Sequence, residues 1–212
     1  MEIANRLAEQ YAERYTSAED ELIKEVGAYT VANHAMPHML SGHLQGKLLE
    51  MISCMIRPLR ILEIGTFTGY SALCLAKGLT EKGQLHTIEL REKEAATAQG
   101  FFNRSVQKEK IILHVGDAAQ LIDELEETWD LVFIDADKSG YINYFNRVLP
   151  KLKSNGFILA DNVLFHGKVL EEQLQGKNAI VIQAFNDFLL HRTDVEKLML
   201  PLRDGIFLIR KI

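Results

Sequence analysis

The feature that most constrains the fold is a regular alternation of short apolar runs with longer amphipathic stretches. The apolar runs are residues 60–64, 84–89, 111–115, 131–135 and 157–161. Between them, apolar residues recur at helical spacing over 70–79, 93–106, 118–125 and 142–152. Strands that alternate with helices in this way predict a parallel sheet that is covered by helices on both faces.

Both ends of the chain add further elements. Residues 2–33 are predicted to form two helices, and a loop over 33–42 leads to a third helix at 42–55. The tail is predicted to hold a helix and two strands, at 180–191, 195–200 and 205–210. Because the turn between these two strands is too short for a helical crossover, they should be antiparallel to each other.

The size of the chain fits one domain. A chain of 212 residues with 47% hydrophobic content can bury one substantial core, and no linker, internal repeat or low-complexity tract divides it. We therefore expect a single domain over residues 1–212. In this domain an N-terminal helical annex (1–56) precedes an α/β core (57–212).

Charge and hydropathy exclude several classes of protein. The net charge is −5 and acids alternate with bases, so a nucleic-acid partner is not expected. No run of 18 apolar residues predicts a membrane span, and the charged N-terminus lacks the apolar region of a signal peptide. Cys54 and Cys74 lie in apolar helical patterns, which predicts buried thiols and a reducing, cytoplasmic compartment.

The first predicted strand leads into a glycine-containing turn that suggests a cofactor. In an open α/β sheet, ligands bind at the carboxyl ends of the strands, and Gly65 would let one approach the backbone closely. Glu63 stands where a dinucleotide motif has its first glycine. Its carboxylate would repel a pyrophosphate but favour a cofactor with ammonium and sulfonium charges, such as S-adenosylmethionine. An ordinary strand-to-helix turn is the alternative.

The next two strands end in acids that could hold a nucleoside. Glu89 ends the second strand, where a carboxylate can bind both ribose hydroxyls, whether of NAD or of S-adenosylmethionine. Asp117 follows the third strand and could accept a hydrogen bond from an adenine amino group, cap the next helix, or do both. A solvated glutamate at a strand end is the alternative for Glu89.

The fourth and fifth strands end in oxygen-bearing side chains. Adjacent strands would bring Asp135, Asp161 and Asn162 together, and such a set suits a hard cation such as Mg²⁺. Lys138 follows the fourth strand and could take a proton from a hydroxyl bound beside such a cation. Turn and helix-capping roles for the three oxygen donors, and a solvated position for Lys138, remain the alternatives.

In combination, these motifs resemble the cation-dependent catechol and caffeoyl-CoA O-methyltransferase family. The resemblance extends from about residue 29 to the C-terminus. It rests on HMLSGHLQG (38–46), LEIGTFTGYS (62–71), IEL (88–90), GDA (116–118), FIDADK (133–138), ADNVLFHGKV (160–169) and LRDGIFLIRK (202–211). It implies a doubly wound, Rossmann-like methyltransferase fold whose seven-stranded, mostly parallel sheet has one antiparallel strand.

The resemblance also implies residue roles. Asp135, Asp161 and Asn162 would ligate the divalent metal, and Lys138 would be the catalytic base. With Asp117 added from its position, the predicted S-adenosylmethionine site comprises Met39, Ser41, Glu63, Gly65, Thr66, Ser71, Glu89, Asp117, Ala118 and Asp135. The predicted acceptor contacts are Asp137, Lys138, Asn162 and Phe165.

Two positions depart from parts of this family. Phe165 and His166 stand where plant-like members usually have Trp, so we expect a different acceptor wall. Asp137 resembles the caffeoyl-CoA branch rather than the catechol branch. Together these positions favour a bacterial-like subgroup that accepts varied catechols.

The sequence therefore predicts an S-adenosylmethionine-dependent O-methyltransferase that acts on a hydroxyl of a catechol-like or caffeoyl-like small molecule. The expected cation is Mg²⁺, with Mn²⁺ and Ca²⁺ as alternatives, and the expected assembly is a homodimer. A metal-independent small-molecule methyltransferase, a non-enzymatic S-adenosylmethionine-binding protein and an NAD-dependent oxidoreductase are the competing hypotheses. Glu63 argues against the last of these.

Overall fold

The computed structural model describes residues 6–212, and the predicted helical residues 2–5 lie outside them. Its α-helices are α1 (Arg6–Tyr15), α2 (Glu21–Asn33), α3 (Gly42–Ile56), α4 (Tyr70–Ala76), α5 (Glu92–Phe102), α6 (Ala118–Glu124), α7 (Tyr141–Lys151) and α8 (Lys177–Leu190). Four short 3₁₀ turns complete the helical segments, η1 (Pro37–Met39), η2 (Lys108–Lys110), η3 (Lys138–Gly140) and η4 (Phe165–Leu170).

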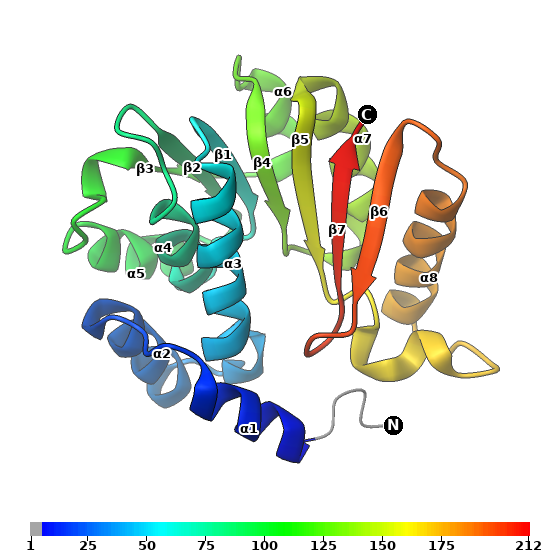
Figure 1. The fold of residues 1–212 in the computed structure, drawn as a ribbon, viewed down its shortest axis with the longest axis horizontal. Coiled ribbons are helices and arrows are strands. Elements are labelled where there is room, and N and C mark those ends of the chain that lie inside the picture. The colour runs from blue at the N-terminus through cyan, green and yellow to red at the C-terminus, as the bar shows by residue number, and fades with distance from the viewer. Residues whose placement is uncertain (1–5) are drawn as a thin grey trace.

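Seven strands form one sheet in the order β3-β2-β1-β4-β5-β7-β6 (Figure 1). They are β1 (Arg60–Ile64), β2 (Gln84–Glu89), β3 (Ile111–Val115), β4 (Trp129–Ile134), β5 (Leu152–Asp161), β6 (Val195–Leu200) and β7 (Ile206–Lys211). Strands β1 to β5 are parallel, and β7 is antiparallel to both β5 and β6. The predicted doubly wound, mostly parallel α/β fold is confirmed, as is the antiparallel pairing of the last two strands.

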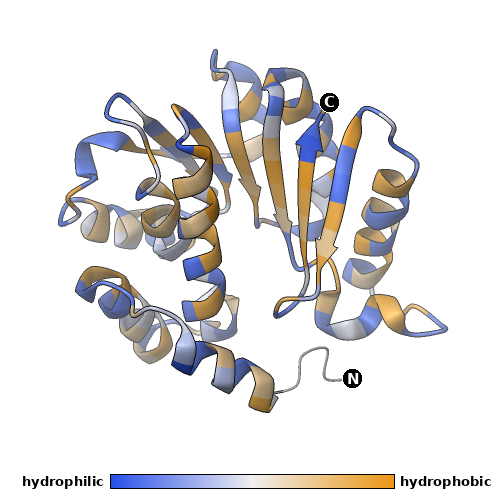
Figure 2. Ribbon diagram, viewed as in Figure 1, coloured by the Kyte–Doolittle hydropathy of each residue, from blue (hydrophilic) through white to orange (hydrophobic). Residues whose placement is uncertain are grey.

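Alternate residues of the strands enter two different cores. On β1, Ile61 belongs to the core that α3, α4 and α5 cover, whereas Leu62 and Ile64 belong to the core that α6, α7 and α8 cover. Figure 2 shows the apolar colour that runs along the central strands. Because both faces of these strands are buried, the strands read as continuous apolar runs in the sequence.

The N-terminal helices are part of the core that α3, α4 and α5 cover. Ile23 and Val26 of α2 lie in the same buried cluster as Leu49 of α3 and Phe133 of β4. The annex predicted over residues 1–56 therefore packs directly on the sheet in the part of the chain that the structure describes.

Several predicted boundaries are wrong. β5 begins at Leu152 rather than at residue 157, because Leu152 pairs with Trp129 across a register shift and Asn155 adopts a left-handed φ of 61°. α5 ends at Phe102 rather than at residue 106. The predicted burial of Cys54 is wrong as well, since Cys54 is exposed on α3, whereas Cys74 is buried as predicted.

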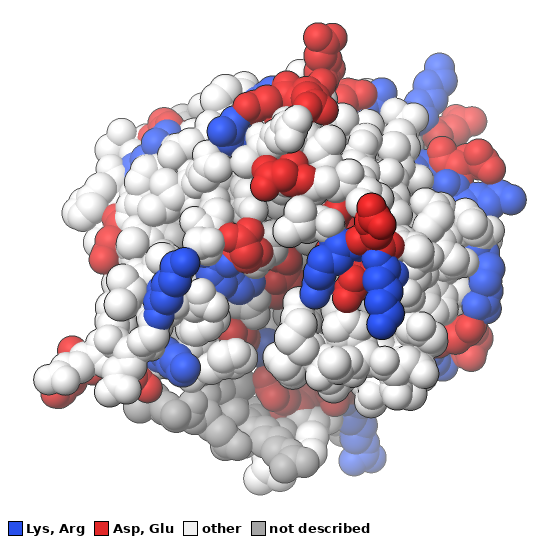
Figure 3. All heavy atoms as spheres, turned by 180° about the vertical axis from the view of Figure 1, so that it is seen from behind, with Lys and Arg blue, Asp and Glu red and all other residues white. Residues whose placement is uncertain are grey.

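The surface carries charges of both signs. Figure 3 shows Lys and Arg close to Asp and Glu on the face that is seen from behind. Within residues 6–212, none of the helices combines the length and the apolar composition that a membrane crossing requires.

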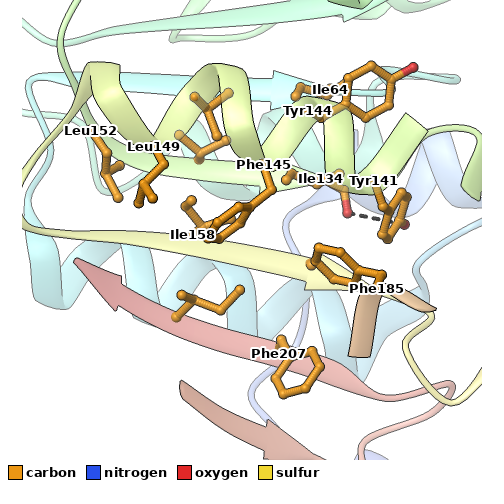
Figure 4. Packing of buried hydrophobic residues seen from close by; sticks show 14 of the residues in the cluster. Ile64, Ile134, Tyr141, Tyr144, Phe145, Leu149, Leu152, Ile158, Phe185 and Phe207 are labelled. Atoms are coloured by element: carbon orange, nitrogen blue, oxygen red, sulfur yellow. Dashed lines mark hydrogen bonds between the residues drawn. The ribbon is translucent and has the colours of Figure 1, made fainter. Parts of the chain in front are cut away.

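Aromatic side chains on α7 and α8 fix the ends of the central strands (Figure 4). The Phe185 ring packs edge-on against Tyr141, with 5.4 Å between the ring centroids. The Tyr141 hydroxyl donates to the Asp161 carbonyl oxygen at 2.9 Å and lies 3.4 Å from that of Ile134. The core thereby ties the carboxyl ends of β4 and β5 to the start of α7.

Candidate active site

A cavity of about 560 Å³ lies at the carboxyl ends of the parallel strands. The strand order reverses there between β1 and β4, which is where doubly wound sheets bind ligands. Of the predicted site residues, those that line this cavity are Met39, Gly65, Glu89, Asp117, Ala118, Asp135, Asp137, Lys138, Asp161, Asn162 and Phe165. Ser41, Glu63, Thr66 and Ser71 are buried behind this lining.

The turn after β1 brings two strands unusually close. Gly65 has a φ of 103°, and a Cβ atom there would lie 2.1 Å from the backbone oxygen of Asp135. Only glycine can therefore occupy this position without moving β4. Gly65 and Asp135 both line the cavity, so this close approach forms part of its wall.

Glu63 presents a buried carboxylate at the end of β1. Its Oε2 accepts a hydrogen bond from the Thr87 hydroxyl, whereas its buried Oε1 has no hydrogen-bond partner among residues 6–212. Burial raises the pKa of Glu63 to about 8; the nearby Ser71 and Thr87 hydroxyls oppose this rise, and the charges of Asp135 and Glu89 add to it. A buried acceptor without a partner fits a cofactor that brings a cationic donor, such as the ammonium group of S-adenosylmethionine.

Glu89 and Asp117 lie where the sequence placed them, at the ends of β2 and β3. Glu89 Oε2 accepts a hydrogen bond from the backbone N–H of Phe67 at 2.8 Å, and its Oε1 accepts one from the Nε–H of Arg91 at 3.2 Å. Asp117 caps α6 by accepting the backbone N–H of Gln120 at 3.1 Å, so the capping alternative for Asp117 is confirmed. Both residues line the cavity, and a carboxylate can accept more hydrogen bonds than these.

Lys138 joins the ends of β4 and β5. Its Nζ donates to Asn162 Oδ1 at 2.6 Å, to the Tyr141 hydroxyl at 2.8 Å and to Asp135 Oδ1 at 3.2 Å. The solvated-lysine alternative is therefore wrong for this structure, because the ammonium group is held by three oxygens at the cavity wall.

Asp161 is the most enclosed acid of the site, with 3% of its surface exposed. Its Oδ2 accepts the side-chain N–H of Gln45 at 2.6 Å, and its Oδ1 accepts the backbone N–H of Asn162 at 2.7 Å. Burial, together with the charge of Asp135, raises the pKa of Asp161 to about 7. When both are ionised, the carboxylates of Asp161 and Asp135 repel each other, and a bound cation would offset this repulsion.

The donor chemistry here fits a hard divalent cation. The Lys138 ammonium stands between oxygens of Asp135 and Asn162, so these oxygens already converge on a positive charge. Within residues 6–212, no group of three or more His, Cys, Asp or Glu side chains is arranged to hold a metal ion. A metal at this place would thus need the amide oxygen of Asn162 beside the carboxylates of Asp135 and Asp161.

Asp137 and Phe165, two of the predicted acceptor contacts, both line the cavity. Asp137 Oδ1 accepts the Tyr144 hydroxyl at 2.5 Å, and its Oδ2 accepts the Ser139 hydroxyl at 2.6 Å. Burial opposes ionisation, yet these hydrogen bonds hold the pKa of Asp137 below its usual value. Phe165 has a φ of 45° and lines the cavity as predicted.

The sequence did not identify several residues that the structure brings to the site. Gln45 of α3 and Tyr141 of α7 contact Asp161 and Lys138, although neither lies at a strand end. Arg203 and Asp204 come from the turn before β7, and they line the cavity because an antiparallel strand starts at the edge where the parallel strands end. The antiparallel direction of β7 is therefore the signal from which Arg203 and Asp204 could have been predicted as site residues.

Comparisons with known proteins agree with this geometry. The family model described as O-methyltransferase matches residues 13–212. A Dictyostelium discoideum protein named "Probable caffeoyl-CoA O-methyltransferase 1" is 32% identical over 208 residues, which cover 95% of this chain and 90% of that protein. The "Catechol O-methyltransferase" of Niastella koreensis is 33% identical over 177 residues, which cover 82% of this chain and 80% of that protein.

A solved structure is similar over nearly the whole chain. The structure of a Podospora anserina methyltransferase with bound S-adenosylhomocysteine superimposes with a TM-score of 0.90 at 27% sequence identity. The superposition covers 97% of this chain and 94% of that one. The bound molecule in that structure is what S-adenosylmethionine becomes when it loses its methyl group.

Proposed function

The chain belongs to the O-methyltransferase family and is an S-adenosylmethionine-dependent O-methyltransferase, and we propose that it methylates one hydroxyl of a catechol-like or caffeoyl-like small molecule in a cation-dependent reaction. One observation supports this proposal most strongly. Lys138, Asp135 and Asn162 converge within hydrogen-bonding distance on the wall of the cavity where β4 and β5 end.

Residues at the ends of β1, β2 and β3 would hold the methyl donor. Glu63 would accept its ammonium group through the free Oε1, and Glu89 would bind the ribose hydroxyls. Asp117 and Ala118 would face the adenine from the start of α6. The buried residues Ser41, Thr66 and Ser71, with Met39 from η1, would shape the remainder of this site.

Asp135, Asp161 and Asn162 would hold a divalent cation, with Mg²⁺ preferred and Mn²⁺ or Ca²⁺ as alternatives. When bound, such a cation lowers the pKa of a phenolic hydroxyl that lies against it. Gln45 fixes one carboxylate oxygen of Asp161 at 2.6 Å, which leaves fewer orientations for that side chain. This constraint favours a rigid donor set.

Lys138 would be the general base. Its amino group would take the proton of the acceptor hydroxyl, and the acceptor oxygen would then form a bond to the methyl carbon as the bond from that carbon to sulfur breaks. Much of the rate would come from positioning, because the oxygen must lie in line with the bond that breaks. Phe165 and Asp137, which also line the cavity, would orient the acceptor ring.

The N-terminal annex would complete the cavity as a lid over the α/β core. Met39 and Leu40, which precede α3, line the cavity together with the strand ends. We therefore retain the division into an annex (1–56) and a cofactor-binding core (57–212) as part of this proposal. The homodimer and the cytoplasmic location stay predictions.

The reaction class is tested by product formation with and without a chelator. The protein is incubated with S-adenosylmethionine and caffeic acid in the presence of Mg²⁺, then with excess chelator, then with Mg²⁺ restored. We expect methylated product to form, to stop on chelation and to resume on restoration. Product that persists under chelation, while cofactor binding is unchanged, would support a metal-independent methyltransferase instead.

The role of Lys138 is tested by Lys138→Met, which keeps the length of the side chain and removes its amino group. We expect kcat to fall by about 10²- to 10⁴-fold. The affinity of the variant for S-adenosylhomocysteine, measured by calorimetry, should stay within a few-fold of the wild-type affinity. Lys108→Met removes an exposed lysine of η2 and is the matched control. Lys138→Met with the kcat of the control would rule out the base assignment.

A further inference from the structure

The segment that follows β5 has an unusual backbone. Asn162, Phe165 and His166 have φ angles of 56°, 45° and 55°, and Gly167 has a φ of 76°. Residues other than glycine rarely adopt this left-handed region of φ and ψ, so contacts from elsewhere in the protein must hold the segment in it. The same segment carries a proposed cation ligand, Asn162, and a proposed acceptor contact, Phe165.

Those contacts converge on Asp204, in the turn between β6 and β7. Its Oδ2 accepts the side-chain N–H of Asn162 at 3.2 Å, and its Oδ1 accepts the backbone N–H of His166 in a short hydrogen bond. The carboxylate is largely enclosed, with 13% of the side chain exposed. One side chain therefore holds two residues of the segment that have left-handed φ angles, Asn162 and His166.

The contact with Asn162 determines which end of its amide faces the cavity. An amide has one end that accepts and one end that donates, and a carboxylate can pair only with the donating end. Because Asp204 takes the N–H₂ group, Asn162 Oδ1 is turned toward Lys138, which donates to it at 2.6 Å. Only the oxygen can ligate a hard cation.

We propose that Asp204 is a positioning residue that fixes the amide of Asn162 with its oxygen toward the cation site and holds the segment 162–167 against that site. This inference rests on the proposed cation-dependent function. Asp204 pairs with the amide nitrogen of Asn162, and the amide oxygen pairs with Lys138, so Asp204 acts on the cation site through Asn162. It acts as an outer partner that orients an inner one.

The fold does not depend on this carboxylate alone. Two backbone hydrogen bonds join the same segments, from the N–H of Val163 to the oxygen of Gly205 at 3.1 Å and from the N–H of Leu164 to the oxygen of Asp204 at 2.8 Å. Replacement of the Asp204 side chain leaves both in place. Asp204→Asn should therefore fold, and its effect on the site can be measured.

The test compares Mn²⁺ binding by wild type, Asp204→Asn and Asp204→Ala, with S-adenosylhomocysteine saturating and no acceptor present. The amplitude of the free Mn²⁺ signal in electron paramagnetic resonance gives the dissociation constant without any turnover. We expect Asp204→Asn to weaken Mn²⁺ binding by about tenfold and Asp204→Ala by up to about 100-fold. Asp187→Asn, on the exposed side of α8, is the matched control and should bind as wild type does.

Two further measurements separate positioning from general damage. Affinity for S-adenosylhomocysteine and the midpoint of thermal unfolding should be nearly unchanged in Asp204→Asn. Wild-type Mn²⁺ affinity in both Asp204 variants would overturn the inference and leave the proposed function standing. A wild-type protein that binds no Mn²⁺ would overturn both. Equal weakening of Mn²⁺ and S-adenosylhomocysteine binding, with a lower unfolding midpoint, would show a structural role and also overturn it.

Discussion

Glu63 carries a buried carboxylate, and its cost to the cofactor-free protein is one that a cationic ligand would offset. It is fully buried on β1, and one of its oxygens accepts from Thr87 while the other has no partner among residues 6–212. Ionising such a carboxylate without a cation beside it costs free energy, because burial removes its hydration. A bound ammonium group would offset that cost, so Glu63 should favour the loaded protein over the free one.

The raised pKa of Glu63 predicts a pH dependence of stability. Burial lifts the pKa of Glu63 from the usual 4.5 to about 8. The contribution of Glu63 to the free energy of unfolding is therefore fully present below pH 4.5 and is lost as the pH rises through 8. Glu63→Gln should remove that loss, by up to about 1.4 kcal/mol for each unit of the shift. It should also weaken S-adenosylmethionine binding at pH 8 by about 10- to 100-fold.

Thermal unfolding between pH 5 and 8.5, with and without S-adenosylmethionine, checks this prediction. Glu109→Gln removes an exposed carboxylate and should follow the wild-type curve. If the cofactor-free Glu63→Gln protein lost stability with pH as steeply as wild type, the titration would belong to another group.

Residues at strand ends could be predicted from the strand pattern, and Met39 and Phe165 from the family resemblance, whereas Gln45 could not be predicted from either. Glu63, Glu89 and Asp135 follow from the rule that parallel strands present their carboxyl ends at one edge. Gln45 lies in the middle of an apolar helical pattern, so its contact with Asp161 depends on how α3 packs against the sheet. The sequence alone does not give that angle.

At the scale of elements, α3 and the end of α4 approach each other too closely for any side chain larger than a hydrogen. A Cβ atom on Gly78 would lie 2.1 Å from the carbonyl carbon of Ser53 and 2.3 Å from its oxygen. Both atoms belong to the backbone and cannot rotate away. The close approach lets the Ser53 hydroxyl donate to the Leu75 carbonyl at 2.6 Å.

Gly78→Ala should therefore push α3 and α4 apart and lower the free energy of unfolding by about 1–3 kcal/mol or more. Gly100→Ala is the matched control, because nothing lies within 4 Å of a Cβ atom at that position of α5. That control should raise the free energy of unfolding by about 0.4–1 kcal/mol. Urea titrations measure both, and equal effects of the two substitutions would contradict the close approach.

The strands were predictable where their sequence is a continuous apolar run. The apolar runs of β1 and β4 are unambiguous, because both faces of these strands are buried. The first half of β5 was missed, since the polar sequence KSNG over 153–156 resembles a turn. Pairing with β4 at Trp129 extends the strand there, which is a tertiary contact that overrides local preference.

At the scale of the whole molecule, the annex and the sheet share one core. Ile23 of α2 and Ile52 of α3 lie in the same buried cluster as Leu131 of β4. A unit with a continuous core loses its packing all at once, so we expect one cooperative unfolding transition. An annex that was only a lid on a finished core would unfold first.

Two probes distinguish these cases. Trp129, the single tryptophan, is fully buried on β4 and reports on the sheet, whereas a fluorophore on the exposed thiol of Cys54 reports on α3. Burial raises the pKa of Cys74, which keeps that thiol from reacting in the folded protein. The two signals should change at the same urea concentration, and Cys54→Ala should leave the Trp129 transition unmoved. A label that responds at lower urea than Trp129 would show that the annex separates from an intact sheet, and the cavity wall at Met39 and Leu40 would then open before the strand ends do.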